Sequence, residues 1–193
     1  MAKRRPRHYF EASTIIALLK REDIDGDQRW WHVQHLLDQG AAGEVEIYMS
    51  GLALAEVTGG KGRSAGIPHP AEFKNVRETV RAFFENDYVQ IVEVGRVVGE
   101  LAQQLIWDFP TLDPFDATHL ASALNAECDV LYTYDRDLLK LASESGQFTL
   151  PKNDEARGMA VRDQLRILRP LWDKEIQRAL PDPLEANGPK QRS

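Results

Sequence analysis

Four separate segments of the sequence carry an acidic side chain soon after a predicted strand or at the start of a predicted helix. These acids are Glu11, Glu56, Asp116 and Asp135, and Asp137 follows two residues after the last of them. Because ligands of open parallel sheets bind beyond the carboxyl ends of the strands, we expect these side chains to meet at one edge of a sheet. Carboxylates crowded into a small space stay ionised only when a cation compensates their charge. Oxygen ligands favour Mg²⁺ or Mn²⁺ over zinc, and a cation held in this way can orient water toward a phosphodiester, so the pattern predicts a nuclease centre.

Each of these acids also has an interpretation that involves structure alone. Asp116 stands three residues after Asp113, which opens a predicted helix, and an acid at that position completes a capping box. Asp135 can cap the next helix, and Asp137 then interacts favourably with the dipole of that helix. Glu56 can be a solvated charge on a helix surface. The nuclease hypothesis therefore depends on whether the acids converge in space.

Strands that alternate with helices are expected to position the acids. Strands are expected over 8–10, 45–50, 88–92 and 129–133. Helices are expected from Ser13 or Thr14 onward, before Gly40 and Gly43, around Glu56, and over 71–86, 96–107, 114–124 and 136–143. This alternation predicts an α/β fold of three layers, in which a central parallel sheet is flanked by helices on both faces.

The overall composition excludes several classes of protein. The 193 residues include 24 Lys+Arg and 30 Asp+Glu, for a net charge of −6, which excludes a generally basic nucleic-acid coat. A single cysteine, Cys128, excludes a disulfide framework and a zinc site with several cysteines. No apolar run approaches the ~18 residues of a membrane span, so a cytoplasmic protein without a membrane segment is expected.

The two ends of the chain differ in character from its middle. Residues 1–7 form a basic leader that contains Lys3, Arg4, Arg5 and Arg7, and the main domain is expected over 8–150. Apolar residues recur at steps of three or four between Val161 and Leu180, which predicts a C-terminal helical extension over 151–180. This helix can dock on the domain or form a dimer or partner surface. Residues 181–193 are rich in proline and polar residues and are expected to be disordered.

Four segments resemble, in order, the motifs of PIN-domain ribonucleases, including the VapC-type toxins. Residues 9–19 (YFEASTIIALL) are similar to the opening strand and Asp-x-Ser turn of that family, and residues 50–57 (SGLALAEV) resemble its second motif. Residues 112–124 (LDPFDATHLASAL) are similar to the third motif, and residues 131–139 (LYTYDRDLL) to the fourth, Thr-x-Asp-x-Asp. The resemblance covers residues 8–150 and predicts the PIN-like fold, a compact parallel α/β sheet.

The resemblance also implies an activity, a cofactor and partners. It implies an endoribonuclease that depends on Mg²⁺ or Mn²⁺, cuts structured RNA such as tRNA, and is inhibited by a cognate antitoxin. The implied catalytic residues are Glu11, Glu56, Asp116 and Asp135, the implied metal ligands are Glu11, Asp116, Asp135 and Asp137, and the implied auxiliary hydroxyls are those of Ser13 and Thr133. Arg136, Lys61 and Arg63 are candidates to contact the RNA backbone. The pairing habit of similar proteins and the apolar face over 161–180 favour a homodimer.

Glu11 departs from the family pattern, which has Asp at the first acidic position. The extra methylene displaces the carboxylate, and Mg²⁺ demands a near-octahedral arrangement of ligands. One alternative is therefore a catalytically weakened or inactive PIN-like domain that binds RNA or a protein. A phosphatase-like or receiver-like domain with an Asp nucleophile is a further alternative, which the dispersal of the acids over four segments disfavours. His119, one turn after Asp116, is expected on the helix surface, with contact to a substrate phosphate as its functional alternative.

Overall fold

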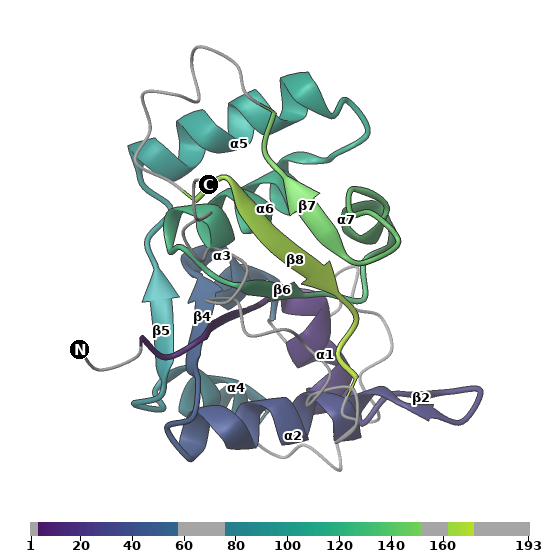
Figure 1. Ribbon diagram of the computed structural model, residues 1–193. Coiled ribbons are helices and arrows are strands. Elements are labelled where there is room, and N and C mark those ends of the chain that lie inside the picture. The colour runs from purple at the N-terminus through teal and green to yellow at the C-terminus, as the bar shows by residue number, and fades with distance from the viewer. Residues whose placement is uncertain (1–3, 58–75, 152–161, 172–193) are drawn as a thin grey trace, which may run out of the picture.

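A six-stranded sheet in the order β5-β4-β1-β6-β8-β7 forms the central layer of the fold (Figure 1). The structure is a computed structural model that describes residues 4–57, 76–151 and 162–171. The parallel strands are β1 (Arg7–Phe10), β4 (Glu46–Ser50), β5 (Val89–Val92), β6 (Val130–Tyr132) and β8 (Gln164–Leu168), and the antiparallel edge strand is β7 (Gln147–Thr149). Strand β1 pairs with β4 on one side and with β6 on the other, so the carboxyl ends of these three strands meet at one edge of the sheet.

Strand β1 is buried on both of its faces. Tyr9 and Phe10 are each 0% exposed, but they belong to two separate core clusters on opposite faces of the sheet. Tyr9 lies beside Leu131 of β6 and shares its cluster, whereas the ring of Phe10 lies 5.2 Å from that of Tyr132. A strand without a polar face requires a helical layer on each side of the sheet.

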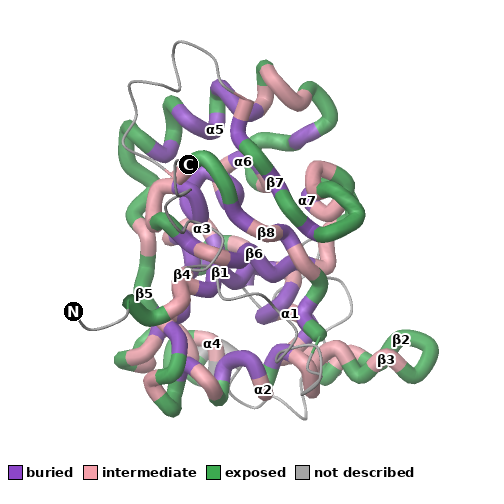
Figure 2. Tube along the Cα trace, viewed as in Figure 1, coloured by how far each residue is buried: buried purple, intermediate pink, exposed green. Residues whose placement is uncertain are grey.

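Helices cover both faces of the sheet (Figures 1 and 2). The helices α5 (Arg96–Asp108) and α6 (Pro114–Asn125) pack on the face of Tyr9, and α1 (Ala12–Lys20) and α2 (Arg29–Ala41) pack on the face of Phe10. The shorter helices are α3 (Gly51–Glu56), α4 (Val76–Phe84) and α7 (Arg136–Lys140). The expected three-layer α/β fold with a mostly parallel sheet is confirmed. Within the described ranges, no helix has both the length and the apolar character of a membrane span.

The first turn of each helix beside the carboxyl edge shows why these helices begin where they do. Asp113 caps α6 and Pro114 follows at its first position, as the sequence predicts. Ser50 caps α3 through a side chain that accepts from the backbone of Ala53. The expectation that Ser13 or Thr14 would cap α1 is wrong, because Glu11 has extended backbone angles and its carboxylate accepts the first free N–H group.

The helical face predicted for the C-terminal segment is wrong for Gln164–Leu168, which form strand β8. Leu165 and Ile167 alternate with more exposed neighbours and are buried, as in a strand. A short apolar run fits both a helical and a strand period, and its parallel pairing with β6 decides between them. The sheet therefore continues past residue 150, and the expected boundary between domain and extension does not hold there. The rest of the predicted helix and the tail over 181–193 lie largely outside the described residues.

A small antiparallel hairpin completes the described fold. Strands β2 (Asp23–Ile24) and β3 (Asp27–Gln28) pair around a turn in which Asp25 and Gly26 have φ angles of 55° and 86°. Figure 2 shows this largely exposed hairpin projecting from the body of the domain.

Candidate metal centre

Glu11 lies at the turn between β1 and α1 and is 5% exposed. Its Oε1 accepts the N–H of Ser13 at 3.0 Å. Its Oε2 accepts the hydroxyl of Ser13 and, at 3.0 Å, the hydroxyl of Thr133. These hydrogen bonds to an ionised group fix the orientation of the carboxylate. Oε1, which lies 3.9 Å from Nε2 of His119, faces the remaining acids.

The hydroxyls that bind Glu11 also connect it to the turn after β6. Oγ1 of Thr133 accepts the N–H of Asp135 at 2.8 Å, and Oγ of Ser13 accepts the N–H of Tyr134 at 3.0 Å. Asp135 caps α7, because its Oδ1 accepts backbone N–H groups of the first turn. Two turns that are more than a hundred residues apart in the sequence are therefore held side by side.

Glu56, the last residue of α3, is bound to a buried histidine. Its Oε2 lies 2.6 Å from Nε2 of His119, whose side chain is 1% exposed. On the other side of the ring, Nδ1 lies 2.8 Å from the hydroxyl of Tyr9 and 3.3 Å from Oγ of Ser50. Because an ionised carboxylate only accepts hydrogen bonds, Nε2 carries a proton and donates a hydrogen bond to Glu56.

Asp116 lies in the first turn of α6, half-buried, and its backbone N–H donates to the cap Asp113 at 2.9 Å. Burial, together with the negative charges of Asp135, Asp113 and Glu11, raises the pKa of Asp116 to about 7. Two of these charges, on Asp135 and Glu11, belong to other segments of the chain. The protein thus concentrates negative charge at the carboxyl edge of the sheet.

Part of this charge is balanced by His119. Burial acts to lower the pKa of His119, but the hydrogen bond to Glu56 and the charges of Glu11, Glu56 and Asp116 outweigh it and raise the pKa above its usual value. The imidazole is therefore an internal cation or proton donor that faces a group of carboxylates.

The residues at this edge fit a divalent cation. Glu11, Glu56 and His119 each offer one ligand atom, and these atoms lie within 4.8 Å of one another. Because Nε2 of His119 carries a proton, the carboxylates are the available donors, and hard cations such as Mg²⁺ and Mn²⁺ prefer carboxylate oxygens. Burial and the charges of the neighbouring acids together raise the pKa of Asp116, and a bound cation would favour its ionised form.

Comparison with known protein families gives a clear result. The model of the PIN domain matches residues 9–144, a stretch that contains all four acids and His119. The chain belongs to the PIN-domain family. PIN domains are nucleases and generally use divalent metal ions.

Two solved structures are similar to this chain at low sequence identity. VapC20 of Mycobacterium tuberculosis, a toxin that cleaves the Sarcin-Ricin loop, is 20% identical over 68% of this chain and 92% of its own, with a TM-score of 0.50. VapBC2 from Rickettsia felis, bound to a DNA fragment from its promoter, is 14% identical over 67% of this chain and 88% of its own, with a TM-score of 0.45. Among curated proteins, none matches the sequence. The likeness to VapC20 concerns the fold.

Among the described residues, the group within 4.8 Å includes none of the other predicted site residues, Asp116 and Asp135 among them. The carboxylate of Asp137 is about half exposed and accepts from Nζ of Lys140 at 2.6 Å, on the outer surface of α7. Arg136 is exposed at the start of the same helix. Lys61 and Arg63 lie outside the described residues.

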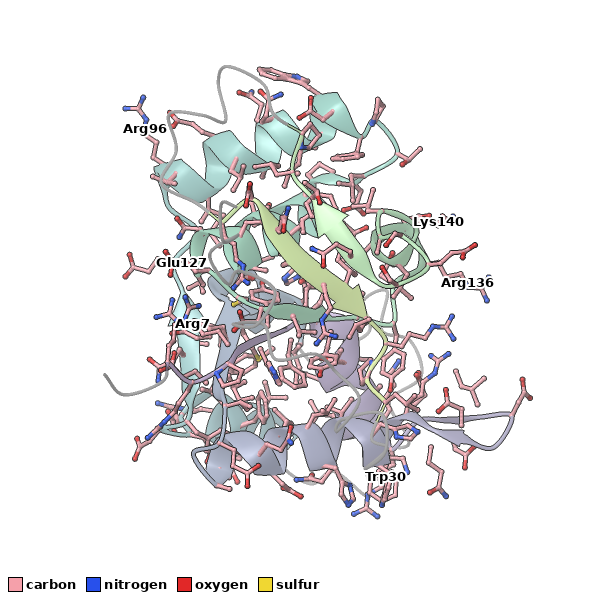
Figure 3. The ribbon with its side chains drawn as sticks, in the orientation of Figure 1. Arg7, Trp30, Arg96, Glu127, Arg136 and Lys140 are labelled. Atoms are coloured by element: carbon pink, nitrogen blue, oxygen red, sulfur yellow. The ribbon has the colours of Figure 1, made fainter. Side chains whose placement is uncertain are left out.

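The basic residues near the N-terminus lie on another side of the domain. Figure 3 shows Arg7 and Glu127 together on one side and Arg136 and Lys140 on the opposite side. Arg7 pairs with Glu46 at 3.0 Å and with Glu127 at 3.3 Å, and Arg4 also pairs with Glu127. Arg4 and Arg7 are thus engaged in ion pairs within the domain.

Sequence reasoning missed three polar residues behind the acids. Tyr9, Ser50 and His119 are each 0% exposed, and the expectation of a surface position for His119 is wrong. His119 stands three residues after Asp116 and therefore shares its helix face, a spacing that places both side chains toward the same site. Ser50, directly after a strand and before a helix, carries the signal of an N-cap. The role of Tyr9 has no comparable signal in the sequence.

Proposed function

We propose that this PIN domain is a Mg²⁺- or Mn²⁺-dependent endoribonuclease and the toxin of a VapBC-type pair. Its substrate in this proposal is a structured RNA such as tRNA, cut in the cytoplasm, and a cognate antitoxin holds it inactive. The family membership supports the nuclease activity. The toxin assignment draws on the likeness of its fold to VapC20, which is itself an RNA-cleaving toxin.

The single observation that carries the proposal is the grouping of Glu11 and Glu56, from two distant segments, around His119. Glu11 and Glu56 both approach Nε2 of His119, at 3.9 Å and 2.6 Å. The charges of Glu11 and Asp135 both act on Asp116. The match to the PIN-domain model disfavours a phosphatase-like or receiver-like domain.

Each residue has a role in the proposal. Glu11, Glu56, Asp116 and Asp135 hold the cation, which when bound activates water and stabilises charge on the phosphodiester. Ser13 and Thr133 orient Glu11 through their hydroxyls.

Three positively charged residues are proposed to bind RNA. Arg136 is exposed directly after Asp135 and is placed to contact a backbone phosphate. Lys61 and Arg63 remain predicted RNA contacts. Asp137 remains a predicted auxiliary ligand, and it must leave Lys140 to reach the other acids.

Glu11 in place of Asp raises the alternative of a weakened PIN domain. In this structure the longer side chain is also the N-cap of α1 and accepts hydrogen bonds from Ser13 and Thr133. We therefore propose that the site is built around Glu11. Cleavage that occurs only after the substitution Glu11→Asp would identify the wild-type chain as the weakened form.

A homodimer also remains a prediction, although one of the two observations that favoured it no longer applies. The apolar helical face over 161–180 does not exist across Gln164–Leu168, which form a strand inside the sheet. The measurement that tests it is the molar mass of the chain in solution by light scattering.

The proposed activity is tested with purified protein and a folded tRNA. We expect cleavage with Mg²⁺ or Mn²⁺ and none with EDTA. Asp116→Asn and Glu56→Gln are each expected to lower the cleavage rate by more than the ~10–100-fold cost of removing an outer partner of a metal ligand. Glu100→Gln is the matched control, because the exposed carboxylate of Glu100 in α5 pairs with Arg96 on the surface. This variant is expected to keep full activity. Intact tRNA and ribosomal RNA with both metals, or full activity in Asp116→Asn, would contradict the proposal.

A further inference from the structure

A chain of buried hydrogen bonds runs from the middle of the sheet to the acid at the end of α3. It begins at the hydroxyl of Tyr9 in β1, crosses the ring of His119 in α6, and ends at the carboxylate of Glu56. Tyr9 and His119 are both 0% exposed, whereas the side chain of Glu56 is 27% exposed. This series of hydrogen bonds thus joins the buried core to a partly exposed side chain.

Glu56 needs such a partner in order to keep one orientation. It is the last residue of α3, a helix of six residues, and a glutamate side chain loses substantial rotamer freedom when it is held in place. The hydrogen bond described for its carboxylate comes from Nε2 of His119 at 2.6 Å. Charge-assisted hydrogen bonds of this length are among the stronger ones in proteins.

His119 is itself held so that its ring has little freedom. Nδ1 lies 2.8 Å from the hydroxyl of Tyr9, and the two rings meet edge to face with centroids 6.0 Å apart. Oγ of Ser50 lies 3.3 Å from the same nitrogen and also caps the start of α3. The short helix α3 is therefore tied to His119 through Ser50 at its beginning and through Glu56 at its end.

We propose that His119 is a positioning residue that holds the carboxylate of Glu56 in the orientation required to bind the divalent cation. This inference rests on the proposed function. His119 acts through Glu56 and is not a ligand, because the proton on Nε2 occupies the position from which the nitrogen would bind a metal. Outer partners of metal ligands typically contribute ~10–100-fold to metal affinity.

The test measures the dissociation constant for Mn²⁺ directly, from the electron paramagnetic resonance signal of the free ion. We expect His119→Leu to weaken Mn²⁺ binding ~10–100-fold, and His119→Gln, which keeps an N–H donor, to recover most of the affinity. Tyr9→Phe, which leaves the ring of His119 in place without its hydroxyl partner, is expected to weaken binding less. The cleavage rate at saturating Mn²⁺ is the second readout.

A double-mutant cycle with Glu56→Gln separates positioning from direct ligation. If His119 acts through Glu56, His119→Leu adds no further loss of affinity in the Glu56→Gln background. A full additional loss in that background would show that His119 binds the metal itself and would overturn the inference. The inference is also overturned if His119→Leu binds Mn²⁺ as tightly as wild type, or if His119→Gln binds it as weakly as His119→Leu.

A control variant separates this role from mere stability. Leu124→Ala removes a fully buried side chain of the same helix and is expected to lower stability without changing Mn²⁺ affinity in the folded protein. An equal loss of Mn²⁺ affinity in Leu124→Ala would assign the effect of His119→Leu to general destabilisation. Wild-type protein that binds no Mn²⁺ and cuts no RNA overturns the proposed function, whereas wild-type binding that His119→Leu leaves unchanged overturns only the inference.

Discussion

Replacing Asp116 by Asn is expected to stabilise the metal-free protein at neutral and alkaline pH. The pKa of Asp116 is raised from 3.8 to about 7 by burial and by neighbouring carboxylates. A shift of this size corresponds to about 4 kcal/mol of unfavourable energy in the ionised folded state. Solvent screening at this half-buried carboxyl reduces the expected effect to about 2 kcal/mol.

The effect has a defined dependence on pH. A carboxyl whose pKa is higher in the folded state than in the unfolded state loses stabilising free energy as the pH rises from 4 to 7. The gain in the free energy of unfolding from Asp116→Asn is therefore near zero at pH 4, grows up to pH 7, and is constant above pH 8. Urea unfolding in EDTA, followed by circular dichroism at pH 4, 6 and 8, measures it.

Asp38→Asn is the matched control for this experiment. Asp38 lies on the exposed side of α2 and accepts from Gln34, a hydrogen bond that Asn can also accept, so its replacement is expected to change stability by less than about 0.5 kcal/mol at every pH. Addition of Mn²⁺ is expected to make the wild type more stable than Asp116→Asn, because the wild type gains the binding free energy and Asp116→Asn does not. Asp116→Asn equal to or less stable than wild type at pH 8 in EDTA would refute the argument that burial and the neighbouring acids penalise the ionised carboxylate of Asp116.

Three further predictions concern the core. Burial lowers the pKa of His8 to about 4, so His8 is expected to reduce the free energy of unfolding by about 3 kcal/mol as the pH falls from 7 to 4. His8→Phe is expected to remove this loss, measured by urea unfolding at a series of acidic pH values. Gly40→Ala is expected to destabilise by about 1–3 kcal/mol in thermal unfolding, because the new Cβ would lie 2.4 Å from Cγ1 of Ile47, whereas Gly99→Ala meets nothing within 4 Å and is expected to be neutral or stabilising. Cys128 is fully buried and burial raises the pKa of its thiol, so a thiol reagent is expected to label it only at the rate of unfolding.

The alternation of strands and helices could be predicted from the sequence because its signals are local. The cap at Asp113 followed by Pro114 marks the start of α6 in the sequence alone. The turn after β6 is similar, because Asp135 follows an apolar strand and caps the next helix. Such residues bond to their own neighbours, so their effect does not depend on the rest of the fold.

Features that depend on distant contacts could not be predicted in this way. Residues 164–168 form a strand because β6 and β7 lie on either side of them, although their apolar spacing also fits a helix. His119 is buried because Tyr9 and Glu56 provide partners for both of its nitrogens. The sequence places the four acids near one edge, but the hydroxyls and the imidazole that orient them become visible only in three dimensions.

The most direct test of the central claim is a crystal structure of the protein with Mn²⁺, located by its anomalous scattering. The account predicts a manganese ion bound by carboxylate oxygens of Glu11, Glu56, Asp116 or Asp135 from at least two of the four segments, within about 2.5 Å. Manganese that binds only at exposed acids outside the proposed site, such as Asp38 or Glu100, would contradict this expectation, as would an absence of manganese between these segments at saturating concentration.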